Sequence, residues 1–219
     1  MSLQLFAHPF SSYCQKALIA FYENDLPFEL RMLSPEEPTH DAELTRRWPL
    51  KRFRMLADGD RTVVEATSII EYLEVRYPGA VRLISGDPHA AVEVRMLDRI
   101  FDNYVATPLQ KIVVNALRPP AARDTQGERE ARELLEASYA WLNERMTTRT
   151  WAAGDAFSLA DCAAAPALFY ADWTHRIDPR FGALTAYRGR LLARPSFARA
   201  VDGGRPYRSF FPLGAPDRD

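Results

Sequence analysis

The first eighty residues alternate between short apolar runs and helical patterns. An apolar run from Ser2 to Ala7 predicts a strand, and a run from Phe28 to Leu33, opened by Pro27, predicts a second one. Between them, apolar side chains recur three and four residues apart, which is typical of a helix with one buried face. Strand, helix and strand in this order predict a parallel βαβ unit. The helical positions are Cys14, Ala17, Leu18 and Phe21.

A hairpin and another helix are expected next. Residues 34–52 are rich in Pro, Glu and Arg and predict a loop with a short helix. Residues 54–57 and 62–65 alternate around the turn Asp58-Gly59-Asp60, which indicates a β-hairpin. A helical pattern then runs to a stop at Pro78-Gly79, so the order βαβ-ββα predicts a four-stranded mixed sheet. Its apolar face consists of Ala66, Ile69, Ile70, Leu73 and Tyr77.

Strand patterns disappear after Gly86-Asp87-Pro88, and only helical spacing follows. Ser158 can cap the free amides of a helix, and Asp161 can complete a capping box with it. The tail from Gly203 to Asp219, rich in Pro and Arg, is expected to be irregular. Helices are expected over residues 89–117 and 127–146, from Ser158 onward, and near 184–193 and 196–201.

These patterns divide the chain into two domains. Residues 1–80 are expected to form an α/β domain, residues 81–88 a linker, and residues 89–219 an all-α C-terminal domain. A chain of 219 residues, of which 47% are hydrophobic, can bury a core of this extent.

The composition argues against several functional classes. The formal net charge is -1 with both signs mixed along the chain, so no basic surface for nucleic acid is expected. No apolar run approaches the roughly 20 residues of a membrane span, and the N-terminus lacks a signal-peptide pattern. Cys14 and Cys162 cannot form a disulfide framework or a zinc site alone. We therefore expect a cytoplasmic protein with no metal, nucleic-acid or membrane partner.

Three N-terminal stretches resemble the cytosolic glutathione S-transferases. They are Ser11–Cys14 at the first turn, Trp48–Leu56 before the hairpin and Val64–Leu73 at the third helix. Ser158–Asp161 also resembles a motif of that family's helical domain. The resemblance covers nearly the whole chain and implies a thioredoxin-like N-terminal domain followed by a helical one. The serine turn is similar to bacterial members of the serine-type, theta- and zeta-like classes.

The resemblance implies a function as well as a fold. Glutathione would be the co-substrate, without a metal, and a small hydrophobic electrophile would be the second substrate. The reaction would be conjugation of the glutathione thiolate or a related glutathione-dependent isomerisation, carried out by a homodimer. The alternative is a binding or scaffold protein of the same fold whose glutathione binding is weakened or lost.

Ser11 and Ser12 are the catalytic candidates. Conjugation needs a thiolate, and the positive end of a helix lowers a thiol pKa of about 8.5. The resemblance to the serine-type classes assigns to Ser11 the hydroxyl that hydrogen-bonds the thiolate, with Ser12 second. Alternatively, Ser11 is only the N-cap of its helix. Cys14 lies on the apolar helix face and is expected to be buried and inert.

Two positions depart from the family's glutathione-binding pattern. Arg54 follows Phe53 at the place where the family has a cis-proline. A cis bond before a non-proline residue costs about 2.5–4 kcal/mol, so a trans bond, or a strained cis bond, is expected. Ala66 replaces a serine at the γ-glutamyl end of the site, which removes a hydrogen bond worth about 1.5–3 kcal/mol.

The remaining candidates complete the expected site. Glu65 can pair with the ammonium of glutathione, and Thr67 can compensate for the missing serine. Lys51 fits the family position at the glycine carboxylate or is a solvated surface lysine, and Arg54 faces either a carboxylate or solvent. The electrophile pocket is expected to contain Phe10, Tyr13, Phe101 and Tyr104, although apolar residues at helical spacing are also typical of a core.

Overall fold

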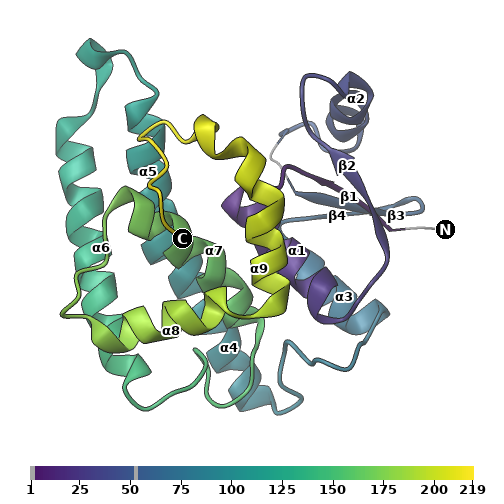
Figure 1. Cartoon of the computed structure of the whole chain (residues 1–219). Helices are drawn as coiled ribbons and strands as arrows, with labels where there is room; N and C mark the ends of the chain where they lie inside the picture. The colour runs from purple at the N-terminus through teal and green to yellow at the C-terminus, as the bar shows by residue number, and fades with distance from the viewer. Residues whose placement is uncertain (1–2, 52–53) are drawn as a thin grey trace.

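A four-stranded mixed sheet forms the N-terminal half of the molecule (Figure 1). The computed structural model describes residues 3–51 and 54–219. The strands lie in the order β2-β1-β3-β4, with β2 parallel to β1 and the other two pairs antiparallel. The expected mixed sheet is confirmed. Its strands are β1 (Leu3–Ala7), β2 (Phe28–Met32), β3 (Met55–Asp58) and β4 (Arg61–Val64).

The side chains of β1 alternate between two cores. Leu5 and Ala7 join the main core with Leu18, whereas Phe6 joins a smaller core with Leu44. Successive side chains of a strand point to opposite faces, so a strand covered on both faces reads as a continuous apolar run. Figure 1 shows α2 on one side of the sheet and α1 and α3 on the other. These helices are α1 (Ser12–Glu23), α2 (Pro38–Arg47) and α3 (Ala66–Arg76).

Helix α7 is the centre of the helical half, since all 16 of its residues are buried. The expected capping box at its start is present: Asp161 accepts from the backbone N–H of Ser158 at 2.9 Å. The division of the chain at residues 80 and 88 stays a prediction. The helices of this half are α4 (Pro88–Ile100), α5 (Thr107–Ala116), α6 (Thr125–Met146), α7 (Leu159–Thr174), α8 (Gly182–Leu192) and α9 (Pro195–Gly204), with a short 3-10 turn, η2, at Pro120–Ala122.

The helix expected over residues 89–117 contains a π-helical turn, η1 (Phe101–Ala106), between α4 and α5. Pro108 has no N–H and cannot donate to the carbonyl of Tyr104, which accepts from the Ser138 hydroxyl at 2.9 Å instead. The N–H of Thr107 bonds to the carbonyl of Asp102, five residues earlier. Because the π-helical turn is wider than an α-helical turn, the side chains of α5 are rotated about the helix axis relative to the continuation of α4.

The C-terminal segment is more regular than expected. After α9, residues Arg205–Phe210 form a 3-10 helix, η3, so the expectation of an irregular tail is wrong there. In Figure 1 this yellow segment lies between the sheet half and α5. Within residues 3–51 and 54–219, no helix combines the length and apolarity needed to cross a bilayer.

Candidate functional site

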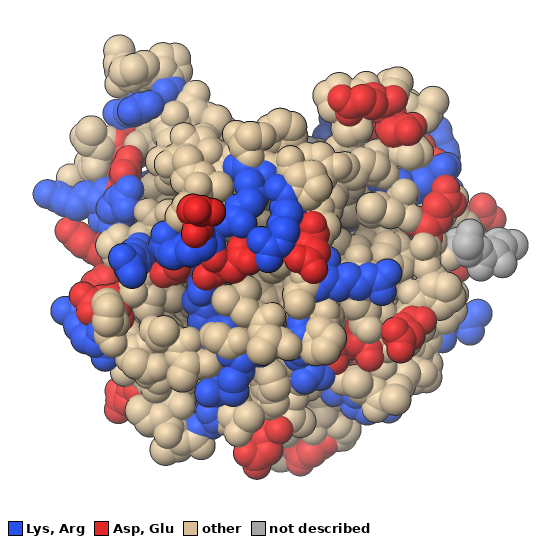
Figure 2. All heavy atoms as spheres, viewed as in Figure 1, with Lys and Arg blue, Asp and Glu red and all other residues tan. Residues whose placement is uncertain are grey.

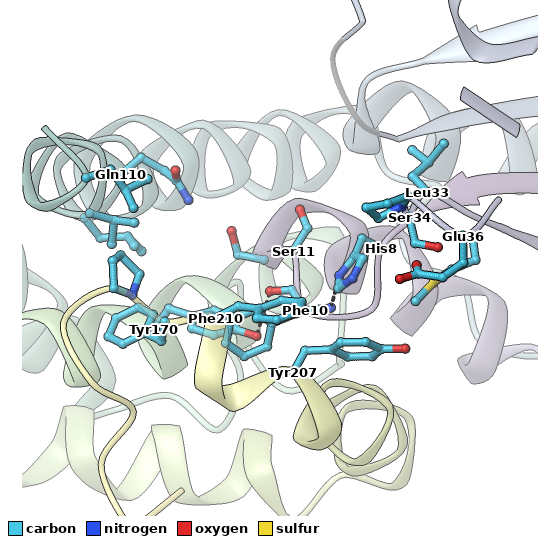
Figure 3. Close-up of a pocket in the computed structure, with 18 of the residues that line it drawn as sticks. His8, Phe10, Ser11, Leu33, Ser34, Glu36, Gln110, Tyr170, Tyr207 and Phe210 are labelled. Atoms are coloured by element: carbon cyan, nitrogen blue, oxygen red, sulfur yellow. Dashed lines mark hydrogen bonds between the residues drawn. The ribbon is translucent and has the colours of Figure 1, made fainter. Parts of the chain in front are cut away.

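A cleft of about 970 Å³ lies between the two halves of the molecule. Figure 2 shows the hollow at the top of the view, with acidic side chains on its α2 side. The start of α1, the loop after β2, α5 and the C-terminal segment all contribute to its walls (Figure 3). The lining residues are His8, Phe10, Ser11, Ser12, residues 32–37, Leu109, Gln110, Val113, Leu117, Tyr170, Tyr207 and residues 210–212.

Ser11 is the N-cap residue of α1, with φ -81° and ψ 124°, yet its hydroxyl does not cap the helix. Hydrogen bonds of the Ser11 backbone hold the turn before α1 in place instead. The N–H donates to the carbonyl of His8 at 3.0 Å, and the carbonyl accepts from the N–H of Gln15 at 2.9 Å. The capping hydrogen bond required by the simple N-cap alternative is therefore not made by this side chain.

The Ser12 hydroxyl is buried in the cleft wall, and no atom of the described structure hydrogen-bonds to it. Ser12 is the first residue of α1, where backbone N–H groups have no partner within the helix. An anion placed at this end would meet those N–H groups, the positive end of the helix dipole and two serine hydroxyls. The structure thus brings Ser11 and Ser12 together on one cleft wall.

Cys14 is fully buried one turn into α1, as the sequence pattern predicted. Burial raises the pKa of its thiol, and hydrogen bonding from the Ser11 hydroxyl and the His8 backbone offsets this only in part. A thiol with a raised pKa carries little thiolate at neutral pH, so Cys14 is not a nucleophile here.

His8 lines the cleft beside the serines. Its Nδ1 accepts from the backbone N–H of Phe10 at 3.2 Å, so the neutral ring carries its proton on Nε2. Burial lowers the pKa of His8, which keeps the ring uncharged at neutral pH. The ring packs edge-on against Tyr207 with centroids 4.6 Å apart.

Arg54 and Glu65, two expected glutathione ligands, form an ion pair at 2.7 Å. The Arg54 guanidinium also lies 4.2 Å from the centre of the Tyr13 ring. Both residues have positive φ angles, 77° for Arg54 and 70° for Glu65, a conformation that is uncommon outside glycine. These three residues meet outside the cleft lining given above, so Tyr13 lies with the charged pair and not in the pocket.

The hydroxyl of the half-buried Thr67 already has hydrogen-bond partners within the protein. Its hydroxyl accepts from the Lys16 ammonium at 2.9 Å and contacts the Asp98 carboxylate at 2.9 Å. Ala66 is buried, and Lys51 is exposed and does not line the cleft. Thr67 therefore does not offer a spare hydroxyl in place of the missing serine. Phe53 and its peptide bond to Arg54 lie outside the described residues.

Two of the expected pocket residues, Phe101 and Tyr104, do not line the cleft. Phe101 is fully buried in the core, so the expectation that it lines the pocket is wrong. Tyr104 is half-exposed but is not among the residues lining the cleft. Phe101 continues the buried face that Leu97 and Asp98 form on α4, which is the core position that helical spacing also allowed. Phe10 does line the cleft, where its ring meets Tyr170 edge-on.

Most of the aromatic wall of the cleft could not be predicted from the sequence. Tyr170 comes from α7, Tyr207 and Phe210 from η3, and each is far from Ser11 along the chain. The Tyr170 hydroxyl donates to the carbonyl of Phe10 at 2.9 Å and so ties the wall to the serine turn. Periodicity cannot reveal such a contact, because it records only which face of one helix is apolar.

A thioredoxin-like sheet domain joined to an all-helical domain, with a cleft at the start of α1, defines the class of protein. Residues 5–81 match the family description "Glutathione S-transferase, N-terminal domain", and residues 105–195 match "Glutathione S-transferase, C-terminal domain". The chain belongs to the glutathione S-transferase family, as predicted, and is a glutathione S-transferase-like enzyme by that membership.

Individual proteins of known name or structure are also similar to this chain. A probable maleylacetoacetate isomerase of Vibrio cholerae is 29% identical over 94% of this chain and 98% of its own length. FtsZ-localized protein A of Caulobacter vibrioides is 32% identical over 62% of this chain and 61% of its own. A glutathione S-transferase of Methylobacterium radiotolerans in complex with glutathione sulfonate superimposes with a TM-score of 0.80 at 27% identity, covering 92% and 95% of the two chains.

Proposed function

We propose that this chain is a glutathione transferase that holds the glutathione thiolate at the start of α1. The observation that carries the proposal is the Ser12 hydroxyl, buried in the cleft wall with no partner in the described structure. A buried polar group without a partner is costly, and a bound thiolate would satisfy it. The glutathione sulfonate held by the Methylobacterium relative supports glutathione as the ligand.

The residues of α1 would provide the chemistry. The hydroxyls of Ser11 and Ser12 both donate to the sulfur, the first-turn N–H groups add positive potential, and together they favour the thiolate over the thiol. The thiol proton goes to solvent. The thiolate then attacks an electrophilic carbon, a sulfur–carbon bond forms, and a leaving group such as chloride departs with its electron pair. The apolar walls would keep the electrophile beside the sulfur.

The γ-glutamyl end is where the fit to glutathione is weaker. We assign Glu65 to the ammonium of the ligand, yet its carboxylate already has Arg54 as a partner. The ammonium would share or displace that partner, and Ala66 offers no hydroxyl to the ligand carboxylate. Lys51 remains available near this loop for the glycine carboxylate. We therefore expect glutathione to bind more weakly than the serine turn alone suggests.

The same site supports two reactions. Conjugation to a small hydrophobic electrophile is the main proposal. The variant is a glutathione-dependent isomerisation, which the name of the Vibrio relative, a probable maleylacetoacetate isomerase, supports. We place either reaction in a cytoplasmic homodimer. Exposed apolar side chains at Val75 on α3 and at Val92 and Met96 on α4 support a paired face.

A binding or scaffold role is the second candidate. The Arg54–Glu65 ion pair favours it, because it occupies the carboxylate that the ligand ammonium needs. The similarity to FtsZ-localized protein A also fits a role in binding other proteins. In that case the cleft would still be present but would not bind a thiol.

Calorimetric titration with glutathione separates the two candidates. A transferase should release heat that saturates at millimolar glutathione or below, and the Ser11→Ala variant should still bind, since most ligand contacts lie elsewhere. Wild-type protein that gives no heat at millimolar glutathione, while its folded state is intact by circular dichroism, would overturn the transferase proposal.

A further inference from the structure

The walls of the cleft are aromatic and largely uncovered. Phe210 projects from η3 with 66% of its surface exposed, although it lines the cleft. Its ring lies 5.9 Å from that of Tyr207, which packs in turn on His8. Exposed aromatic rings around a concave surface are typical of a site for a planar apolar molecule, because such a molecule buries them on binding.

Charge on the lining is of one sign. Glu36 and Glu37 lie in the loop after β2, on the cleft rim, and both are exposed. A hydrogen bond from Ser34 lowers the pKa of Glu36, so its carboxylate is ionised at neutral pH. Among the described residues that line the cleft, none is Lys or Arg, and the ring of His8 is neutral.

With the glutathione thiolate at the start of α1, a carboxylate on the second substrate would meet no Lys or Arg side chain among the described residues of the cleft lining. It would lose hydration against the aromatic walls and face the two glutamates across the cleft. An uncharged aromatic molecule meets neither cost. Glu36 and Glu37 thus act against anions, while the rings of Phe10, Tyr207 and Phe210 attract the apolar part of the substrate.

We propose that the cleft selects its second substrate by charge: it accepts uncharged aromatic electrophiles and rejects those that carry carboxylates. This inference rests on the proposed transferase function and deepens it. It favours conjugation of neutral aromatic compounds over isomerisation of a carboxylated substrate at the same site.

Two fluorescent dyes of matched shape test the selection in the presence and absence of millimolar glutathione, whose thiolate would occupy the anion site at the start of α1. N-phenyl-1-naphthylamine is uncharged, and 8-anilino-1-naphthalenesulfonate carries an added sulfonate. The wild-type protein should bind the neutral dye about ten-fold or more tightly than the anionic one, because like charges disfavour association. In the double variant Glu36→Gln, Glu37→Gln, the Kd of the anionic dye should fall several-fold while that of the neutral dye stays unchanged.

Two further variants test whether the dyes bind in the cleft. Phe210→Ala should weaken both dyes, since it removes an exposed ring of the wall. Glu133→Gln on α6, an exposed carboxylate outside the cleft lining, should change neither. Equal binding of the two dyes by the wild type, an unchanged anionic Kd in the double variant, or dye binding unaffected by Phe210→Ala would each overturn the proposal.

The outcome is separable from that of the transferase proposal. A protein that discriminates the dyes but gives no heat with glutathione keeps the charge selection and loses the transferase function. A protein that binds glutathione but treats the dyes alike keeps the function and loses the selection. Turnover of neutral and carboxylated chloronitrobenzenes by the wild type then extends the test to the reaction, with faster conjugation of the neutral compound expected.

Discussion

The ammonium of Lys16 lies 2.6 Å from the carboxylate of Asp98, and both side chains are almost completely buried. Lys16 belongs to α1 and Asp98 to α4, so this ion pair joins the sheet half to the helical half. Asp102 of η1 also pairs with Lys16, at 2.8 Å, and Thr67 of α3 accepts from it. The helix that carries the two serines is thus fixed by charge one turn below them.

Loss of the lysine should therefore destabilise the whole molecule. Lys16→Met should lower the free energy of unfolding by about 3 kcal/mol, because the buried Asp98 would lose its buried cation and keep only the half-exposed Arg99 and the Thr67 hydroxyl as partners. Lys111→Met is the matched control: its partner Glu130 is 3.4 Å away and both side chains are exposed, so the loss should stay below about 1 kcal/mol. Urea unfolding monitored by circular dichroism measures both. Similar losses in the two variants would contradict the assignment.

Substitution of the serines should separate their roles. Ser11→Ala should raise the apparent pKa of bound glutathione thiol by about one to two units and cut kcat/KM with a chloronitrobenzene roughly ten- to hundred-fold, the effect of one hydrogen bond to a charged group. Ser12→Ala should also cut turnover, because it removes the second donor to the thiolate, but it should not destabilise the free protein, in which this hydroxyl has no partner to lose. The pH dependence of turnover reports the thiol pKa.

A control and an opposing outcome complete that test. Ser68→Ala, an exposed serine of α3 outside the cleft lining, should leave turnover and its pH dependence unchanged. A Ser11→Ala variant with normal turnover, beside a strongly impaired Ser12→Ala variant, would move the thiolate contact from Ser11 to Ser12.

Features encoded by local patterns were predictable from the sequence. The apolar run of β1, the hairpin around Gly59 and the capping box of Ser158 and Asp161 each depend on neighbouring residues, and all are present. The hydroxyl of Tyr187 also donates to Asp161, at 2.6 Å. The capping-box pattern could not predict this contact, because Tyr187 lies 26 residues further along the chain.

Features that depend on contacts between distant parts of the chain could not be predicted from local patterns. Phe101 lies four residues after the buried Leu97, so its helical spacing fits a core position as well as a pocket position, and only the packing of the helices decides between them. The buried ion pairs of Lys16 have no local signal in the sequence, because both of its acidic partners lie more than eighty residues away. The cleft itself depends on η3, whose aromatic residues carry no local sign of their position.

The hairpin should be sensitive to acid through Asp58. Its carboxylate accepts from the hydroxyls of Tyr72 at 2.6 Å and Tyr77 at 2.7 Å, and these hydrogen bonds lower the pKa of Asp58. A folded pKa below the unfolded value of about 3.9 gives stability that is present above pH 4 and is lost as the pH falls through the folded pKa. Tyr72→Phe should therefore lower the free energy of unfolding by about 0.5–1 kcal/mol at pH 7.

The pH dependence distinguishes this effect from simple loss of packing. The difference between the wild type and Tyr72→Phe should shrink as urea unfolding is repeated from pH 5 down to pH 2, because Asp58 becomes protonated in both proteins. A difference that stays constant over this range would mean that the hydroxyl acts through packing and not through the charge of Asp58.

The pair formed by Arg54 and Glu65 should control glutathione affinity. Arg54→Gln frees the Glu65 carboxylate for the ligand ammonium, so the Kd for glutathione should fall by a few-fold, the size expected of an exposed ion pair. Glu65→Gln removes the assigned partner of the ammonium and should raise the Kd. Arg61→Gln, which alters an exposed arginine on β4, is the control and should leave the Kd unchanged. Calorimetric titration measures all three, and a weaker affinity in Arg54→Gln would instead assign Arg54 to a carboxylate of glutathione.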